Sequence, residues 1–187
     1  SGTSNLGADV TTSGTQTYTG AVTLSGDDRT LTAGNNQITF GNTVNSEASQ
    51  AHALTLNVGT SEVEFNGIVG GATNGSLGAM TITGNLDLNT DIASAASLSV
   101  SGTSNLGADV TTSGTQTYVK EITLSTDVTL NALLLDLQST TNGGGKNLSI
   151  IGETFIADTM SNLGSLSITG PVDLGGNITT SGTQTYN

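Results

Sequence analysis

The chain has 187 residues, a formal net charge of -12 and a sequence pI near 4.1, and it contains no Cys, no Trp and one Pro. Only three residues are basic (Arg29, Lys120 and Lys146), which excludes the cationic surface that binding to nucleic acid or to an anionic membrane requires. No apolar run approaches the ~20 residues of a membrane span. We therefore expect no nucleic-acid partner and no membrane-spanning segment.

Short runs that alternate apolar with small or polar residues follow one another along the chain, and this period of two is typical of half-buried strands. Helical patterns are weak and confined to residues 47–52 and 133–137. Turn-forming Gly, Asn, Asp and Ser residues separate the runs. The sequence therefore predicts an all-β chain. The alternating runs are residues 21–24, 37–40, 53–58, 63–65, 80–83, 98–100 and 148–150.

Internal repetition is the strongest signal in the sequence. Residues 1–18 recur without change as residues 101–118, and residues 165–187 contain a third, degenerate copy. The chain thus divides into repeats 1–100 and 101–187, each built from sub-repeats of roughly 15 to 25 residues. We interpret residues 1–187 as one segment of a single repetitive architecture.

Two architectures suit such sub-repeats, a stack of β-sandwich domains and a parallel β-helix in which each sub-repeat forms one coil. A β-sandwich of this size normally has a large aromatic residue in its core, and here aromatic residues make up only 3% of the chain. We favour a β-solenoid of roughly 8 to 10 coils with rungs about 4.8 Å apart. Its interior is expected to be aliphatic and too slender for bulky rings.

The amino-acid sequence of the repeat also resembles that of a known group of proteins. The pattern TTSGTQTYTGAVTL at residues 11–24, followed by runs such as ITFG at 38–41 and ALTLNV at 53–58, is similar to the β-strand repeats of bacterial surface proteins. That group includes the filamentous-haemagglutinin-like and autotransporter-like adhesins. The resemblance implies a secreted, right-handed β-helix that acts as a stalk, an adhesin or a matrix component. It transfers no catalytic residue.

Catalytic chemistry has little support in the sequence. Glu62 and Glu64 lie in or beside repeat strands, so we expect them on a solvated face, and the single His, His52, has no nucleophile motif around it. His52 is expected to be an ordinary surface or loop residue. Arg29 follows two Asp residues and is expected to pair with one of them. We predict no enzymatic activity and no catalytic residue.

We predict no cofactor and no defined metal site; weakly bound calcium is the one ligand considered, because carboxylate oxygens abound and the net charge attracts cations. The candidate ligands are Asp27 with Asp28, and Asp87 with Asp91, of which the latter two would face one side of a strand. No EF-hand loop and no calcium-binding nonapeptide is present, so only weak binding is expected.

Two polar motifs recur in the chain. Asn74, Asn147 and Asn177 satisfy the N-glycosylation sequon and are candidate modification sites. The tetrad TQTY occurs at residues 15–18, 115–118 and 183–186. It is either a surface ladder for glycans or neighbouring filaments, or a structural corner in which Tyr covers the end of the core. The structural corner is the favoured interpretation.

Together these patterns favour an extracellular or bacterial cell-surface structural protein, a mature product or an excised segment of a longer rod. Its partners are expected to be further copies joined head to tail into fibres, and glycans or cell surfaces. A carbohydrate- or host-binding adhesin module, with its site in residues 45–53 or 139–147, is the alternative. A β-helical enzyme that degrades polysaccharides is the third reading.

Overall fold

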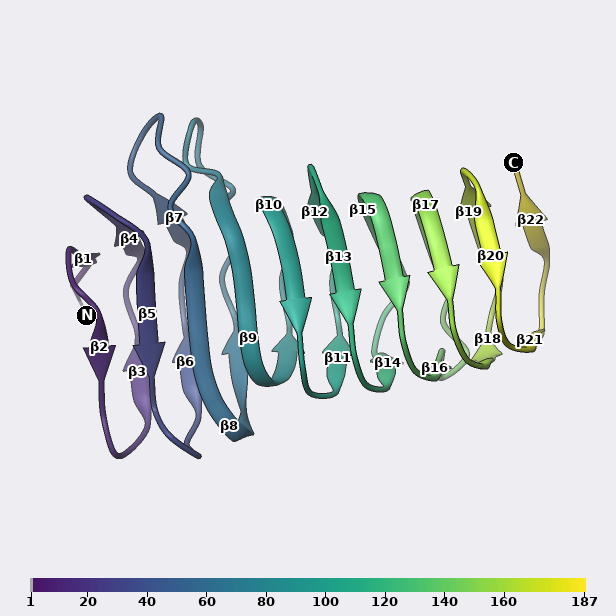
Figure 1. Ribbon diagram of the computed structural model, residues 1–187, viewed down its shortest axis with the longest axis horizontal. Helices are drawn as coiled ribbons and strands as arrows, with labels where there is room; N and C mark the ends of the chain where they lie inside the picture. The colour runs from purple at the N-terminus through teal and green to yellow at the C-terminus, as the bar shows by residue number, and fades with distance from the viewer. Residues whose placement is uncertain (1) are drawn as a thin grey trace.

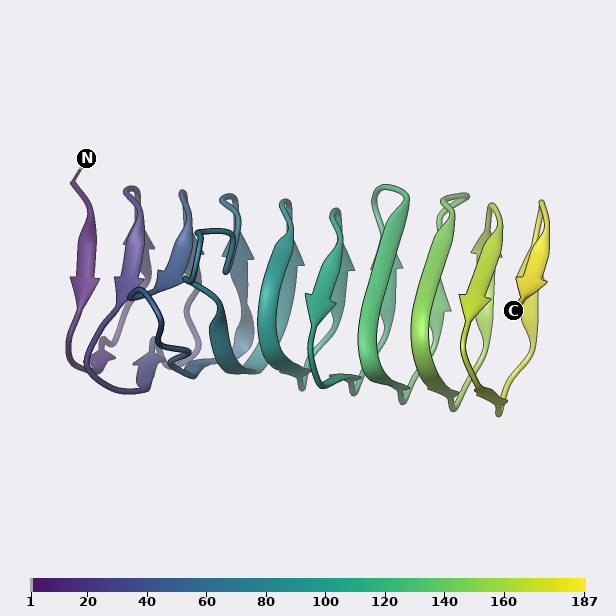
Figure 2. The same cartoon turned by 90° about the horizontal axis from the view of Figure 1, so that it is seen from above.

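The computed structural model describes residues 2–187, and every regular element in them is a β-strand. Parallel strands stack into a β-solenoid of about ten turns (Figure 1), which confirms the expected parallel β-helix. The two chain ends lie at opposite ends of the rod (Figure 2). No helix long and apolar enough to cross a membrane occurs in residues 2–187.

Each turn has three sides, and like sides pair in register to form three faces of the rod. Strands β8 (Leu54–Phe65), β9 (Leu77–Leu88), β10 (Ile92–Val100), β15 (Val128–Leu137) and β17 (Leu148–Ile156) bend around a corner and serve two faces each.

Face 1 contains the shorter strands β1 (Ser4–Leu6), β4 (Val22–Leu24), β7 (Val44–Ser46), β12 (Val110–Thr112), β19 (Leu166–Thr169) and β22 (Gln184–Tyr186). Face 2 contains β2 (Val10–Thr11), β5 (Arg29–Thr32), β13 (Thr115–Tyr118) and β20 (Val172–Leu174). Face 3 contains β3 (Gln16–Tyr18), β6 (Ile38–Phe40), β11 (Ser104–Leu106), β14 (Ile122–Leu124), β16 (Thr141–Asn142), β18 (Met160–Leu163) and β21 (Ile178–Thr180).

One turn takes 18 residues where corners are tight, as between the paired residues Leu86 and Ser104, and 25 where a loop intervenes, as between Val44 and Val69. These lengths fall in the predicted range of the sub-repeats. The added residues of the longer turns form excursions at the corners, so the paired sides keep their register.

The core is a set of inward-facing columns that run the length of the rod. On face 2 one column contains Leu31, Leu56 and Ile82 in successive turns, and all three side chains are buried. The expected purely aliphatic interior is wrong, however. Tyr18, Phe40 and Phe65 stack on face 3 with ring centroids 5.2 and 5.0 Å apart. Flat rings fit because this separation is close to the spacing of neighbouring strands.

The three copies of the repeat occupy different faces. The segment SNL lies on face 1 as Ser4–Leu6 but on face 3 as Ser104–Leu106. The aligned segment of the degenerate copy, Val172–Leu174, lies on face 2. One sequence can therefore form any of the three sides of a turn, because all three sides have similar length and the same alternation of buried and outward residues.

The two weak helical patterns form no helix. Residues 47–52 form a turn in the loop that leads into β8, and residues 133–137 belong to β15. In β15 the continuous apolar run still alternates, since Leu133 is exposed while Leu135 and Leu137 are buried. Parallel pairing on both edges of β15 overrides the local pattern.

Candidate functional site

Two loops leave the N-terminal half of the rod side by side, and the first of them contributes to a cluster of hydrogen-bonded polar side chains. One joins β7 to β8 and the other precedes β9, and both rise above the faces in Figure 1. Their backbones are joined by the Ser49 N–H, which donates to the Asn74 carbonyl at 2.9 Å. Ser49 and Asn74 both adopt positive φ, of 65° and 59°, which places tight bends at the two loop tips.

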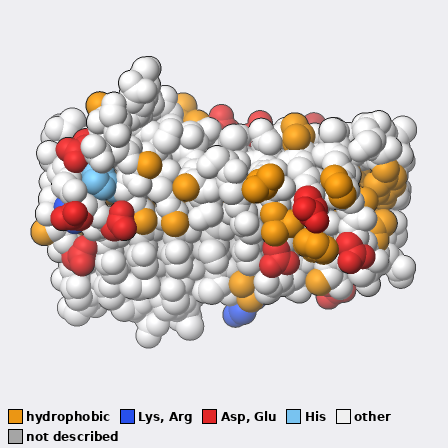
Figure 3. Space-filling model, turned by 45° about the horizontal axis from the view of Figure 1, so that its top comes forward, with side chains coloured by type: hydrophobic (Ala, Val, Ile, Leu, Met, Phe, Trp, Pro, Cys, Tyr) orange, Lys and Arg blue, Asp and Glu red, His pale blue; other side chains and the backbone are white. Residues whose placement is uncertain are grey.

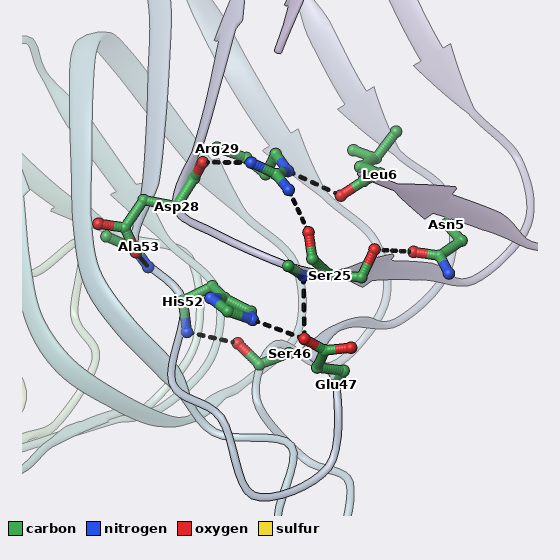
Figure 4. Close-up of polar contacts among 10 residues, drawn as sticks. Asn5, Leu6, Ser25, Asp28, Arg29, Ser46, Glu47, His52 and Ala53 are labelled. Carbon is green, nitrogen blue, oxygen red and sulfur yellow. Dashed lines mark hydrogen bonds and ion pairs between the residues drawn. The ribbon is translucent and has the colours of Figure 1, made fainter. Parts of the chain in front are cut away.

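His52 and Glu47 close the first loop (Figure 4). The His52 ring is buried, and its Nε2 lies 3.1 Å from Glu47 Oε1. The His52 backbone N–H donates to Ser46 Oγ at 2.9 Å. Glu47 Oε1 also accepts a hydrogen bond from the Gly26 N–H at 2.9 Å, so the carboxylate ties this loop to the preceding turn. His52 was expected to be an ordinary surface or loop residue, and its burial corrects the surface part of that prediction.

Arg29 lies next to this cluster with its side chain buried (Figure 4). Its guanidinium donates to three backbone carbonyls: Nε to Leu6 at 2.8 Å, Nη1 to Asp28 at 2.7 Å, and Nη2 to Ser25. The expected pairing with an Asp carboxylate is wrong. The guanidinium instead joins carbonyls of the first two turns at this corner, and the Leu6 carbonyl also accepts the Ser25 N–H at 3.1 Å.

The cluster lacks the geometry of a hydrolase. The hydrogen-bond partner of the His52 ring is a carboxylate, whereas the Ser46 hydroxyl contacts the backbone of His52 rather than its ring. A nucleophile needs its hydroxyl hydrogen-bonded to the ring that takes its proton. The arrangement instead fixes the loop, because Glu47 Oε1 is hydrogen-bonded both to the Gly26 N–H and to the His52 ring. We call Gly26, Glu47 and His52 the clip.

The clip makes stability depend on pH. Hydrogen bonds from the Gly26 N–H and from His52 hold the pKa of Glu47 below its ordinary value, with a smaller contribution from the nearby charge of Arg29. A lowered pKa in the folded state means that the stabilisation is complete above the ordinary value of 4.5 and disappears as the pH falls through the folded-state pKa.

We expect Glu47→Gln to lower the melting temperature at pH 7, and we expect the difference from the wild type to shrink as the pH falls below 4.5 and through the folded-state pKa, because the wild-type carboxylate is then protonated as well. Thermal unfolding followed by circular dichroism over a series of pH values from 7 downward tests this. Glu121→Gln is the control, because among residues 2–187 the Glu121 side chain forms no hydrogen bond. A constant gap between wild type and Glu47→Gln across the pH range would contradict the clip.

The calcium candidates are not brought together. Asp28 Oδ1 accepts the Ala53 N–H at 2.7 Å, and Asp27 is exposed beside it. Asp87 Oδ1 accepts from Asn105 Nδ2 at 2.8 Å, whereas Asp91 lies beyond the end of β9, so the two do not share a strand as expected. Within residues 2–187 no group of three or more His, Asp or Glu side chains has the spacing of a metal site.

The carboxylates have a structural task that the sequence analysis missed. Asp residues at the corners accept a backbone N–H from the next turn, which supplies hydrogen bonds where the strand pairing is interrupted. The sequence pattern that marks these corner Asp residues is an Asp directly before an inward-facing Val or Ile, as in ADV and TDI. The pairs are Asp9 with Thr30, Asp91 with Asp109, Asp109 with Thr129 and Asp127 with Asn147.

Asp127 shows the strength of these corner contacts. Its carboxylate accepts both the backbone and the side-chain N–H of Asn147 at 2.9 Å, and these bonds lower the pKa of Asp127. The glycosylation candidate Asn147 thus has its amide nitrogen in a hydrogen bond. Asn74 and Asn177 lie on exposed turns, and modification at all three remains a prediction.

The TQTY motif forms the same contacts in all three copies. The Tyr hydroxyl donates to the Gln Oε1 at 2.9, 3.3 and 3.0 Å, and the Gln Nε2 reaches a backbone carbonyl six residues earlier. Burial differs greatly: Tyr118 is fully buried, Tyr18 is half-buried and Tyr186 is 43% exposed. The three copies lie on different faces, so they form no continuous surface ladder. The motif itself lies in the strands β3, β13 and β22 rather than at a corner, and its Gln side chain reaches back across the preceding corner.

A hollow of about 680 Å³ lies near the C-terminal end of the rod, and most of the residues around it are Asn, Gly, Thr or Ser. Asn142, Gly144 and Gly145 line it, and they lie within residues 139–147, which were proposed as a binding loop. Residues 141–142 of that segment form strand β16 rather than a loop. Leu163 and residues 179–181 line the hollow as well.

Comparisons with protein-family models, with curated proteins and with solved structures find no match.

Proposed function

We propose that this chain is a structural rod without enzymatic activity, part of an extracellular stalk, fibre or matrix filament of a bacterial surface, which extends when further coils stack on its end turns. The observation that carries the proposal is that one sequence forms two different turns of the rod, residues 2–18 and residues 102–118, with the same Tyr–Gln and Gln–backbone hydrogen bonds. A turn made of this sequence can be covered by a further coil on either side, as residues 102–118 are, whether that coil belongs to the same polypeptide or to a second copy.

In the last turn described, apolar side chains are exposed that a further coil, of the same polypeptide or of a second copy, would bury. Leu174 and Tyr186 are 45% and 43% exposed there, whereas Tyr118, the equivalent of Tyr186, is completely buried in the interior. The outward edges of β20, β21 and β22 also present backbone N–H and C=O groups for a further strand.

The interchangeable sides define the register of this contact. A second copy rotated by one side places Ser4–Leu6 on Val172–Leu174, Val10–Thr11 on Ile178–Thr180, and Gln16–Tyr18 on Gln184–Tyr186. Equivalent segments of the repeat then lie on each other, with Tyr18 over Tyr186. The contact is heterologous, so it propagates into a filament rather than closing.

Electron microscopy and sedimentation of the purified chain test this proposal. We expect fibres, which Tyr186→Lys abolishes because a charge enters the stacking surface. Thr185→Lys is the matched control, since Thr185 is the outward neighbour in the same strand and keeps the apolar end intact. Monodisperse monomers of the unmodified chain at high concentration would refute end-to-end stacking.

The hollow of about 680 Å³ favours a second candidate function, the binding of a carbohydrate by the 139–147 loop. Its amide and hydroxyl groups suit sugar hydroxyls. A glycan array on the purified chain tests this candidate: a saturable hit that Asn142→Ala removes supports it, and the absence of any saturable hit argues for a scaffold alone.

A further inference from the structure

An aromatic side chain stands on the outer surface of face 2 where the rod otherwise carries small polar residues. The outward column runs through Thr81, Ser99 and Thr117 to Asp136, and then through Phe155 to Asp173. Phe155 is 41% exposed, whereas Phe40 and Phe65 are buried. The core therefore does not need this ring, and Thr would fit the strand equally well.

Carboxylates flank the ring on both sides. Asp136 and Asp173 are the register neighbours of Phe155, each about 4.8 Å away along the ladder. Glu153 is exposed two residues before it in the same strand. Among residues 2–187 no Lys or Arg forms an ion pair with any of the three, because the one ion pair found there joins His52 to Glu47.

Exposed aliphatic groups continue the surface at the adjacent corner. Leu133 is 71% exposed and Ile151 is 42% exposed. Figure 3 shows hydrophobic side chains gathered among carboxylates on the C-terminal half of the rod. We call Leu133, Ile151, Phe155, Asp136, Glu153 and Asp173 the acidic-apolar patch.

The surface beside the ring is hollowed. One depression of about 150 Å³ lies between Phe155, Pro171 and Asp173, and another of about 200 Å³ lies on the side of Ala157 and Gly175. Phe155 and Asp173 line both depressions. The patch is therefore shaped to accept side chains, with negative charge beside each depression.

We propose that the acidic-apolar patch binds a segment of a partner protein that carries arginine between aliphatic residues. The guanidinium lies on the Phe155 ring and donates to Asp136 and Asp173, while the aliphatic side chains contact Leu133 and Ile151. Arginine suits this position because its planar group stacks on aromatic faces and forms forked hydrogen bonds with carboxylates.

Charge decides between possible occupants. The chain has only three basic residues, and its one arginine, Arg29, is buried, so the sides of a second copy offer the patch no exposed guanidinium and only Lys120 and Lys146 as cations. The carboxylates of the patch repel an anionic membrane. A cationic, apolar segment of another protein complements both the charge and the hydrophobic surface, and this inference is independent of end-to-end stacking.

Fluorescence anisotropy with labelled peptides at 0.15 M salt, a concentration that screens distant charges, tests the proposal. The probe is a peptide of alternating Leu and Arg. The two control peptides replace Arg by Glu, or Leu by Gly. We expect saturable binding of the Leu–Arg peptide, at least about tenfold tighter than that of either control.

Surface variants locate the site. Phe155→Thr and the double variant Asp136→Asn with Asp173→Asn are expected to weaken binding about tenfold or more. Ile68→Thr and Asp27→Asn are matched controls, an exposed apolar residue and an exposed carboxylate outside the patch, and should leave binding unchanged. No binding of the Leu–Arg peptide, or equal binding by the Gly–Arg peptide, overturns the proposal. Side-by-side association of copies of this chain, abolished by Phe155→Thr and also by Lys120→Gln, would overturn it too, because the cation on the patch would then come from Lys120 of a second copy.

Discussion

Replacing Tyr118 by Ala is expected to lower the free energy of unfolding by about 3–5 kcal/mol, the usual cost of deleting a buried aromatic ring. Tyr118 is completely buried between Val100 and Leu137 on face 2, and its hydroxyl donates to Gln116 Oε1 inside the core. Burial also raises the pKa of Tyr118 well above its ordinary value of 10.0, since the phenolate cannot be solvated there. The variant leaves both a cavity and an unsatisfied amide oxygen.

Tyr186 supplies an internal control for this experiment. It has the same TQT segment before it and the same hydroxyl bond to a Gln, but it is 43% exposed in the last turn. Tyr186→Ala should cost less than about 1 kcal/mol. Urea denaturation followed by circular dichroism gives both values. Equal losses in the two variants would show that the Tyr–Gln hydrogen bonds, rather than burial in the core, determine the contribution of the motif.

Replacing Gly152 by Ala is expected to destabilise the rod by about 2–6 kcal/mol, from backbone strain and from overpacking together. A β-carbon at Gly152 would lie 2.0 Å from the carbonyl oxygen of Ala132 in the turn below. Its φ of 132° is also a conformation that residues with side chains rarely adopt. Neither problem can be relieved without separating two turns at this corner.

Gly14 is the matched control, because it also lies at a corner. A β-carbon there would meet no atom within 4 Å, and φ is not positive. Gly14→Ala should therefore change stability by less than about 0.5 kcal/mol. Thermal and urea unfolding of both variants test this pair. A Gly152→Ala protein as stable as the wild type would mean that neighbouring turns approach each other less closely at this corner.

The sequence contained enough information to predict the solenoid. The period of two in runs such as residues 53–58, and the exact recurrence of residues 1–18, predict stacked strands of roughly one turn per sub-repeat. The stacked rings of Tyr18, Phe40 and Phe65 could not be predicted. Their positions in three successive turns depend on the loop lengths between them, and these lengths are irregular.

The polar cluster was less predictable than the fold. Arg29 follows Asp27 and Asp28, so an ion pair was the simplest inference from neighbouring residues. In the rod, however, its guanidinium donates to the Leu6 carbonyl, which only the stacking of turns brings within range, and to the carbonyls of Ser25 and Asp28 in its own turn. His52 and Glu47 meet because the loop between them folds back, and a loop of this kind has no sequence period from which to infer its shape.

The equivalence of the three sides has a consequence for how such a rod can change length during evolution. An insertion or deletion of about six residues moves everything beyond it by a third of a turn, and the displaced segments still find columns that accept them. Copies spaced by fractions of a turn are therefore as viable as copies spaced by whole turns. Each such event also swings the surface beyond it around the long axis, so that the direction in which Phe155 points can be reset in steps while the core is preserved.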